Sequence, residues 1–343
     1  MKTSFRVGSV MIMVLINTLA AVSWIAYDRL QPVVLQVLEV SDERIFLDLV
    51  RSVVMVVVPV STGWIAGTMS FRKDGSVLVV ASGLSLAAIV FIGVAMDLRW
   101  FLIPSSWVPF MIFMWLVGMN MFLGPANSLL VRYTERSELA FAVSLSIVVA
   151  DTLYAAENLI GDLLYSIGLM PVFAGAGIAL AVVALVFNKQ VTEEERSEVD
   201  GESGDRKNNL VAVALTGLAA GLLLVTIQSF LPIWVMAKAA GVLQSDGKEL
   251  IVPAVLVIAA VVAVPSSGLI SRIGVKRSLA FGLAGTVLSL AFTFMVPGAV
   301  ATLAGTLATG IFLGLLMVAV FPFVVSCLKE ETIPFGTGLL FSA

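Results

Sequence analysis

Carboxylates and amides recur at helical spacing inside segments of this sequence that are otherwise apolar. Residues 139–165 place Asp151, Asn158 and Asp162 on one stripe of a helix, with Glu157 off the stripe. A charged side chain at bilayer depth costs about 3 kcal/mol unless it faces protein or water, so each one is a functional candidate. Asp151, near the middle of the segment, is the leading candidate for a carboxylate that carries a coupling proton. The alternative is a structural ion pair with an arginine of the first two segments.

A second polar face occupies the first apolar segment, residues 9–38. Asn17, Trp24 and Asp28 follow one another at spacings of seven and four residues, which puts them on one side of a helix. Asp28 lies in the outer half of this segment with Arg29 beside it. The two charges either line a solute cavity or lie near the outer membrane surface, where charge costs little.

Neutral amides supply further candidates. Asn120 and Asn127 share a helical face with Gly124, and Gln228 lies in the seventh apolar segment. Amides donate and accept hydrogen bonds to a polar solute without the cost of a charge. The alternative is hydrogen bonding between helices beside close-packed glycines.

Arg44, Asp48 and Arg51 follow one another at spacings of four and three where the second apolar segment begins. We interpret them as an ion cluster at the membrane interface rather than as a site. The expected pathway of solute and ions comprises Asp151, Asp28, Arg29, Glu157, Asp162, Asn158, Asn120, Asn127, Asn17 and Gln228.

The composition is that of a membrane protein, with 59% hydrophobic and 13% charged residues and a mean hydropathy of +1.06. The sequence has no histidine and a single cysteine, Cys327, so we predict no metal site, no cofactor and no internal disulfide. It also lacks the DDxxD and GxSxG motifs, which argues against a membrane enzyme. The net charge of -3 predicts no nucleic-acid partner.

Ten apolar runs are each long enough to cross a bilayer as a helix, and an eleventh begins near Phe335. The expected spans are Ser9–Leu38, Phe46–Ser70, Ser76–Met96, Val108–Val131, Leu139–Tyr165, Met170–Phe187, Leu210–Ala237, Leu250–Ile270, Ser278–Met295 and Ala299–Cys327. The distribution of Lys and Arg between the loops predicts a multi-pass protein of the plasma membrane with a cytoplasmic amino terminus.

The acidic stretch QVTEEERSEVDGESGDRKNN divides the apolar sequence into two parts. We expect a six-helix bundle over residues 1–189, a solvated cytoplasmic connector over 190–209, and an incomplete second bundle over 210–343. The two parts repeat weakly, since IAYDRLQPVVLQVLEV aligns with VTIQSFLPIWVMAKAA and matches Pro32 with Pro232. Parallel repeats of this kind are one plan for alternating-access carriers.

A turn in the second part, SGLISRIGVKRS, resembles the GxxxDRxGRR signature of the major facilitator superfamily. It keeps Arg272, Gly274, Lys276 and Arg277, with Ser271 where the family has Asp. The first copy, GWIAGTMSFRKDG, keeps the basic pair Arg72 and Lys73, and Gly67 replaces the Asp. The resemblance implies an all-α polytopic fold of two parallel six-helix repeats, here with about 10–11 spans, and places these basic residues at cytoplasmic gate turns.

The stretch GMNMFLGPANSLLVRYTER is faintly similar to the GPxRxLLxD motif of the sugar:cation symporter branch. Asn127 stands where that motif has Arg, and Arg132 where it has Asp. The resemblance implies a secondary transporter that moves a small-molecule solute with H+ or Na+ as the coupling ion. The alternative is a transporter-like sensor or interaction partner that no longer transports, or a non-functional truncated carrier, because both gate turns lack their acid and the second repeat is short.

Overall fold

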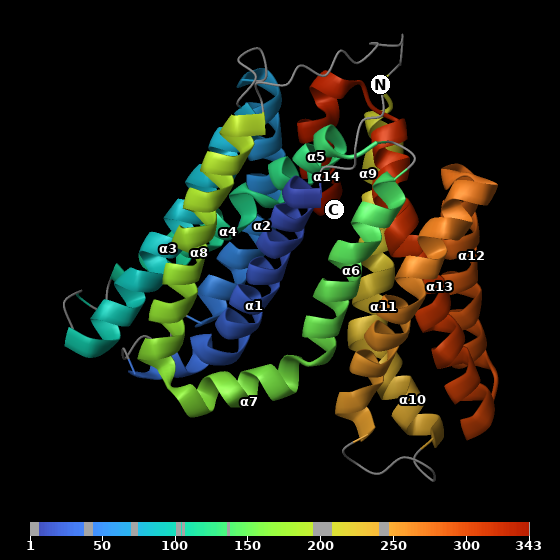
Figure 1. Ribbon diagram of the computed structural model, residues 1–343. Coiled ribbons are helices and arrows are strands. Elements are labelled where there is room, and N and C mark those ends of the chain that lie inside the picture. Colours follow the sequence, from blue (N-terminus) through green and yellow to red (C-terminus); the bar gives the residue numbers. More distant parts are fainter. Residues whose placement is uncertain are drawn as a thin grey trace. The chain divides into compact units, whose positions relative to one another are not determined.

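The computed structural model describes residues 7–37, 44–69, 75–100, 104, 107–135, 138–194, 208–239 and 247–342. Within these ranges every regular element is a helix (Figure 1). Nine of these helices are long and apolar enough to cross a membrane, or ten if a bent pair counts as one span. The expected all-α polytopic fold is confirmed.

The described helices form two compact units. The first unit covers Met1–Tyr133, Glu157–Leu210 and Leu328–Ala343, and the second covers Thr134–Ala156 and Val211–Cys327. The chain therefore passes from one unit to the other after Tyr133, Ala156, Leu210 and Cys327 rather than within the connector at 190–209. The expected division of the chain into bundles at 1–189 and 210–343 stays a prediction.

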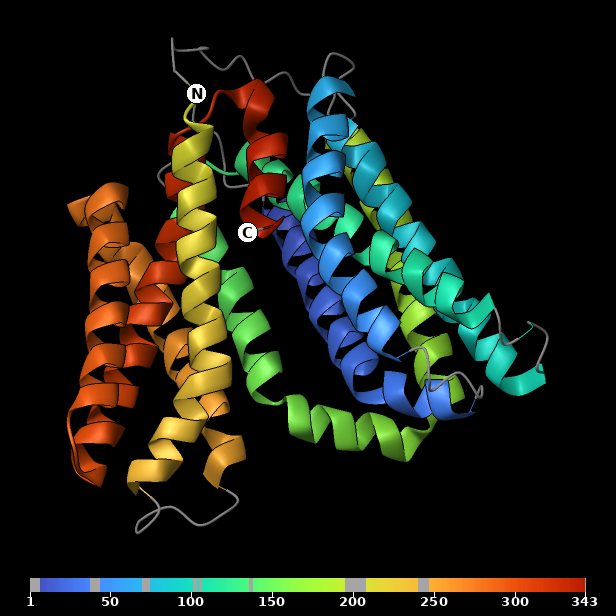
Figure 2. The ribbon, with the colours of Figure 1, turned by 180° about the vertical axis from the view of Figure 1, so that it is seen from behind.

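The helices of the first unit pack through small residues. α3 contacts both α4 and α8 along much of its length (Figure 2). A Cβ at Gly177 of α8 would lie 2.9 Å from the carbonyl oxygen of Ala88 in α3, so only glycine allows this approach. The unit contains α1 (Val7–Val37), α2 (Arg44–Met69), α3 (Gly75–Trp100), α4 (Val108–Met121), α5 (Leu123–Tyr133), α7 (Glu157–Ile167), α8 (Leu169–Glu194), η5 (Glu330–Thr332) and α14 (Ile333–Ser342).

The short helix α14 packs on α2 and α5 of this unit. A Cβ at Gly338 would collide with the carbonyl of Pro59, and one at Gly63 would collide with the carbonyl of Pro334. The hydroxyl of Thr337 donates a hydrogen bond to the carbonyl of Gly124 at 3.0 Å. Paired glycines therefore bring these backbones into direct contact, and a buried hydrogen bond fixes their register.

In the second unit, α11 packs against α6 and α13, and α12 packs against α13. At one end of α12, Lys238 of α10 donates hydrogen bonds to the carbonyls of Thr293, Phe294 and Val296 at 2.8, 2.7 and 3.0 Å. The lysine thus satisfies carbonyls that the helix end leaves without an intrahelical partner. The unit contains α6 (Leu139–Ala155), α9 (Leu210–Val225), η3 (Thr226–Phe230), α10 (Leu231–Ala239), α11 (Lys248–Ile273), α12 (Val275–Met295) and α13 (Ala299–Ser326).

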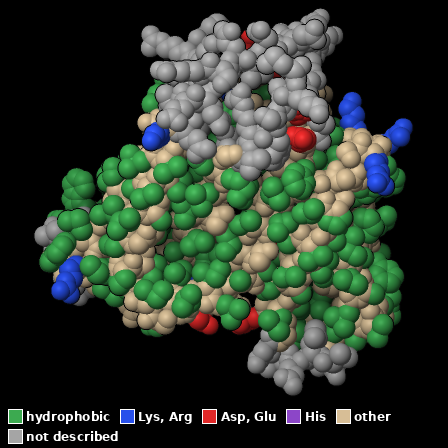
Figure 3. Space-filling view, in the orientation of Figure 1, with side chains coloured by type: hydrophobic (Ala, Val, Ile, Leu, Met, Phe, Trp, Pro, Cys, Tyr) green, Lys and Arg blue, Asp and Glu red, His purple; other side chains and the backbone are tan. Residues whose placement is uncertain are grey.

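Apolar side chains dominate the face that Figure 3 shows, and Lys and Arg lie toward its margins. Many outward side chains are large and exposed, among them Leu185, Val211 and Val261, at 72%, 69% and 70%. Such a surface is suited to contact with lipid chains rather than water.

Three expected spans are interrupted. The span at 139–165 is not one helix, because α6 ends at Ala155 and α7 begins at Glu157 with a bend of 65°. The span at 108–131 breaks at Phe122, where Pro125 cannot continue the helical hydrogen bonding. The span at 210–237 contains the π-helical turn η3, directly before Pro232.

Candidate functional site

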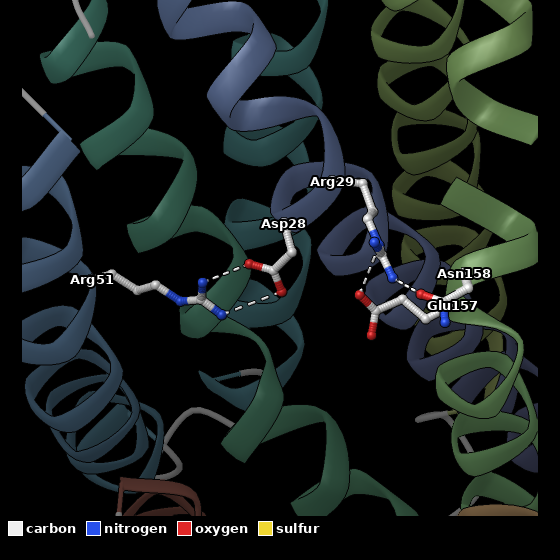
Figure 4. A network of polar contacts seen from close by, with 5 residues as sticks. All are labelled: Asp28, Arg29, Arg51, Glu157 and Asn158. Carbon is white, nitrogen blue, oxygen red and sulfur yellow. Dashed lines mark hydrogen bonds and ion pairs between the residues drawn. The ribbon is translucent and has the colours of Figure 1, made fainter. Parts of the chain in front are cut away.

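Charged side chains of α1, α2 and α7 meet within the first unit (Figure 4). Asp28 accepts hydrogen bonds from the guanidinium of Arg51 at 2.5 and 3.4 Å. The neighbouring Arg29 points to α7, where its Nε donates to Glu157 at 3.1 Å and its Nη2 donates to Asn158. Successive residues of a helix point about 100° apart, so α1 directs these opposite charges to two different helices.

Glycine makes room for the second of these pairs. A Cβ at Gly161 of α7 would lie 2.9 Å from Cγ and 3.1 Å from Cδ of Arg29. The aliphatic part of the arginine therefore lies on the backbone of α7 before its head reaches Glu157. The side chains of Arg29 and Glu157 are 41% and 37% exposed, so this pair is only partly covered by protein.

Trp24, Tyr27 and Trp115 form a cluster of aromatic rings, which we call the aromatic wall. The guanidinium of Arg51 packs against this wall. The Arg51 Cζ atom lies 5.0 Å from the ring centroid of Trp24 and 5.7 Å from that of Tyr27. Tyr27 and Trp115 are stacked, with centroids 4.3 Å apart and an interplanar angle of 9°. Cation–π attraction to these rings adds to the ion pair with Asp28.

The Asp28–Arg51 pair is neither fully buried nor fully exposed. The side chains of Asp28 and Arg51 are 34% and 29% exposed. Gln31, three residues after Asp28 in α1, and Trp115 of the aromatic wall each carry a buried donor, Nε2 and Nε1, that has no hydrogen-bond partner among the described residues. The site thus combines a partly exposed guanidinium with residues that carry unsatisfied N–H groups.

Asp151 lies elsewhere, in α6 of the second unit. Its side chain is buried, and within the described part of the chain its Oδ2 atom has no hydrogen-bond partner. The expected stripe from Asp151 through Asn158 to Asp162 is wrong, because the break after Ala155 turns α7 away from the direction of α6. Asn158 binds Arg29, whereas Asp162 is exposed.

The remaining amide candidates either have a polar partner already or are exposed. Asn120 donates to the carbonyl of Leu116 and Asn127 to that of Leu123, both at 2.8 Å within their own helices. Asn17 has a polar interaction and is only partly buried. Gln228 is exposed within the turn η3.

The expected gate turn at 272–277 is a tight turn between α11 and α12. Gly274 ends α11 and begins α12 with a φ of +88°, which favours glycine. Arg272, Lys276 and Arg277 are exposed beside it. Arg72 and Lys73, expected in the corresponding first turn, lie outside the described residues.

Sequence reasoning missed the roles of Arg51, Trp115 and Lys238. Arg51 was expected in an interfacial cluster with Asp48, but it binds Asp28 instead. The available signal was its position seven residues into α2, inside an apolar segment where an arginine needs a partner. Among the described residues, no group of three or more His, Cys, Asp or Glu side chains could hold a metal ion.

The sequence matches no protein-family model and no curated protein. The fold is similar to that of several solved transporters. The fucose:proton symporter FucP of E. coli superposes with a TM-score of 0.69 at 14% identity, covering 99% of this chain and 89% of that chain. A bacterial homologue of the iron transporter ferroportin gives 0.70 at 15% identity, covering 97% and 88%. The human organic anion transporter MFSD10 gives 0.69 at 12% identity, covering 97% and 89%. The chain therefore has the major facilitator superfamily fold.

Proposed function

We propose that this protein is a secondary active transporter that moves a small solute across the plasma membrane by alternating access. The fold supports this proposal, because the solved structures with the same fold that are named above are transporters. The observation that carries it is the Asp28–Arg51 pair, an ion pair that is only partly covered by protein on helices that otherwise suit a bilayer. Charges are kept in such segments at a cost, and they mark solute or ion pathways.

Coupling to H+ or Na+ requires a carboxylate that can exist with and without its cation. Asp151 meets this requirement best, because it is buried and its Oδ2 is unsatisfied within the described part of the chain. A permanent ion pair at Asp151 finds no support among the described salt bridges. We therefore assign the coupling role to Asp151, with Asp28, Arg29, Glu157 and Asn158 in the solute pathway.

A transporter-like sensor is the second candidate function. Ser271 and Gly67 stand at the two turn positions where the resemblance would place an acid. Without these acids the turns lose ion pairs that would hold one state closed. A sensor needs a binding site but no net flux, so solute binding alone does not separate the two functions.

Flux measurements in proteoliposomes test the proposal. A transporter gives saturable solute uptake that exceeds uptake by protein-free liposomes, and an acidic exterior or an external Na+ gradient drives accumulation above the outside concentration. Absence of any flux for a solute that binds the purified protein would favour the sensor. The amino terminus and the connector are placed in the cytoplasm in this proposal, and labelling of single cysteines introduced there tests the orientation.

A further inference from the structure

We propose that the solute is an organic anion whose carboxylate binds Arg51 at the edge of the aromatic wall, with Asp28 as a competing ligand within the protein. The inference deepens the proposed function, because it names the class of solute. The binding part of the inference does not depend on transport.

Arg51 already binds a carboxylate with the geometry that a solute would use. Its Nη1 and Nη2 contact the two oxygens of Asp28 in a forked arrangement. A planar guanidinium recognises carboxylates in this way whether they belong to the protein or to a ligand. Because about a third of each side chain is not covered by protein, a carboxylate that reaches the site can compete for the same donors.

The surroundings of the pair favour a ligand that accepts hydrogen bonds. Gln31 follows Asp28 by three residues and Tyr27 by four, so it lies on the same side of α1. Its Nε2 and the Nε1 of Trp115 are buried donors without a partner among the described residues. A buried donor gains most from an acceptor that arrives with a ligand. Gln31 and Trp115 are 7% and 3% exposed, so an anion reaches either donor only when neighbouring side chains move.

A cationic solute is the opposite possibility, because aromatic faces beside a carboxylate also bind organic cations. In this structure the guanidinium of Arg51 itself occupies that place. A second cation would have to displace the guanidinium from these rings, and it supplies no acceptor for the donors of Gln31 and Trp115. The observations therefore favour the anion.

The network in Figure 4 also explains why Arg51 rather than Arg29 is the anchor. Arg29 has two partners on α7, Glu157 and Asn158, and its stem lies against Gly161. Arg51 has one acidic partner among the described ion pairs. Removing that partner, Asp28, frees Arg51 without deleting any group that would contact the anion.

Thermal-shift titration of the detergent-solubilised full chain tests the site with three probes of similar shape, benzoate, benzamide and benzyltrimethylammonium. We expect benzoate to stabilise the protein in a saturable manner, and benzamide and benzyltrimethylammonium to have no saturable effect.

Asp28→Asn removes the competitor and should strengthen benzoate binding severalfold. Arg51→Gln should weaken it about tenfold or more, as expected for loss of a charge-assisted hydrogen bond. Glu331→Gln, which removes an exposed acid in the same unit, is the control and should change the affinity less than about threefold.

Weaker benzoate binding by Asp28→Asn would overturn the inference, and this result does not depend on whether the Arg51 variant folds. Saturable binding of benzyltrimethylammonium, equal binding of benzamide, or no binding of benzoate would overturn it as well. Anion binding without flux in proteoliposomes would support the site and contradict transport. Flux of a neutral solute without anion binding would contradict the site and support transport. The two failures are therefore distinguishable.

Discussion

Asp28 of α1 binds Arg51 of α2 through both of its carboxylate oxygens, at 2.5 and 3.4 Å. The two residues are separated by 23 positions in the sequence, on the first two helices of the chain. The pair joins these helices while leaving about a third of each side chain exposed. It is therefore both a structural link and an accessible charged group.

Replacing Arg51 with Lys keeps the charge but removes the forked geometry and the planar contact with the aromatic wall. We expect Arg51→Lys to destabilise the detergent-solubilised protein by about 1 kcal/mol, because the pair is only partly covered by protein. Thermal unfolding followed by circular dichroism measures this change. A destabilisation as large as about 4 kcal/mol would show that the pair behaves as a fully buried ion pair, against the exposure described above.

Replacing Asp151 with Asn removes the proposed site of the coupling ion and keeps the side-chain shape. Accumulation of solute against a gradient should be lost in Asp151→Asn, whereas exchange of labelled for unlabelled solute continues. Uptake with and without an imposed ion gradient measures the difference. Glu249→Gln is the matched control, because Glu249 is an exposed acid at the start of α11 in the same unit. Unchanged uphill uptake by Asp151→Asn would remove Asp151 from the coupling role.

Replacing Gly338 with Val separates α14 from α2. The new side chain collides with the carbonyl of Pro59, and overpacking of this kind costs about 1–3 kcal/mol. Thermal unfolding should detect a clear loss of stability. Gly175→Ala is the control, because no atom lies within 4 Å of a Cβ built at Gly175. A Gly338→Val protein as stable as Gly175→Ala would contradict the close packing of α14.

Replacing Lys238 with Met leaves three carbonyls near the end of α12 without their donor. Loss of partners to buried polar groups costs about 1–3 kcal/mol, so we expect a destabilisation in that range. Thermal unfolding of Lys238→Met beside Lys248→Met measures it, since Lys248 is exposed at the start of α11. Equal stability of the two variants would mean that the carbonyls are satisfied without Lys238.

The positions of the spans could be predicted from the sequence, because apolar length is a local property. The expected Met170–Phe187 span corresponds to α8, which begins at Leu169, and the span expected from Ala299 begins at that residue. The break between α6 and α7 could not be predicted from turn residues, since Ala155, Ala156 and Glu157 include neither proline nor glycine. The turn η3 does have a local signal, because Pro232 lacks an N–H for the helix.

The candidate site was predictable only in part. Asp28, Arg29, Glu157 and Asn158 could be singled out, because polar groups in apolar segments are visible in the sequence. Their pairing could not, because it depends on how α1, α2 and α7 are rotated toward one another. The same rotation decides that Arg51 faces Asp28 and the aromatic wall rather than the membrane surface.

The flux of a bound solute tests the account most directly. Proteoliposomes that contain the full chain are loaded with unlabelled 4-sulfobenzoate, a benzoate whose sulfonate stays ionised and prevents passive crossing as a neutral acid, and entry of radiolabelled 4-sulfobenzoate is followed over time. We predict saturable entry well above that of protein-free liposomes, and a strong reduction in Arg51→Gln proteoliposomes. If 4-sulfobenzoate binds the solubilised protein but enters proteoliposomes no faster than protein-free liposomes, the protein is not a transporter of the anion that it binds, and the sensor function gains support.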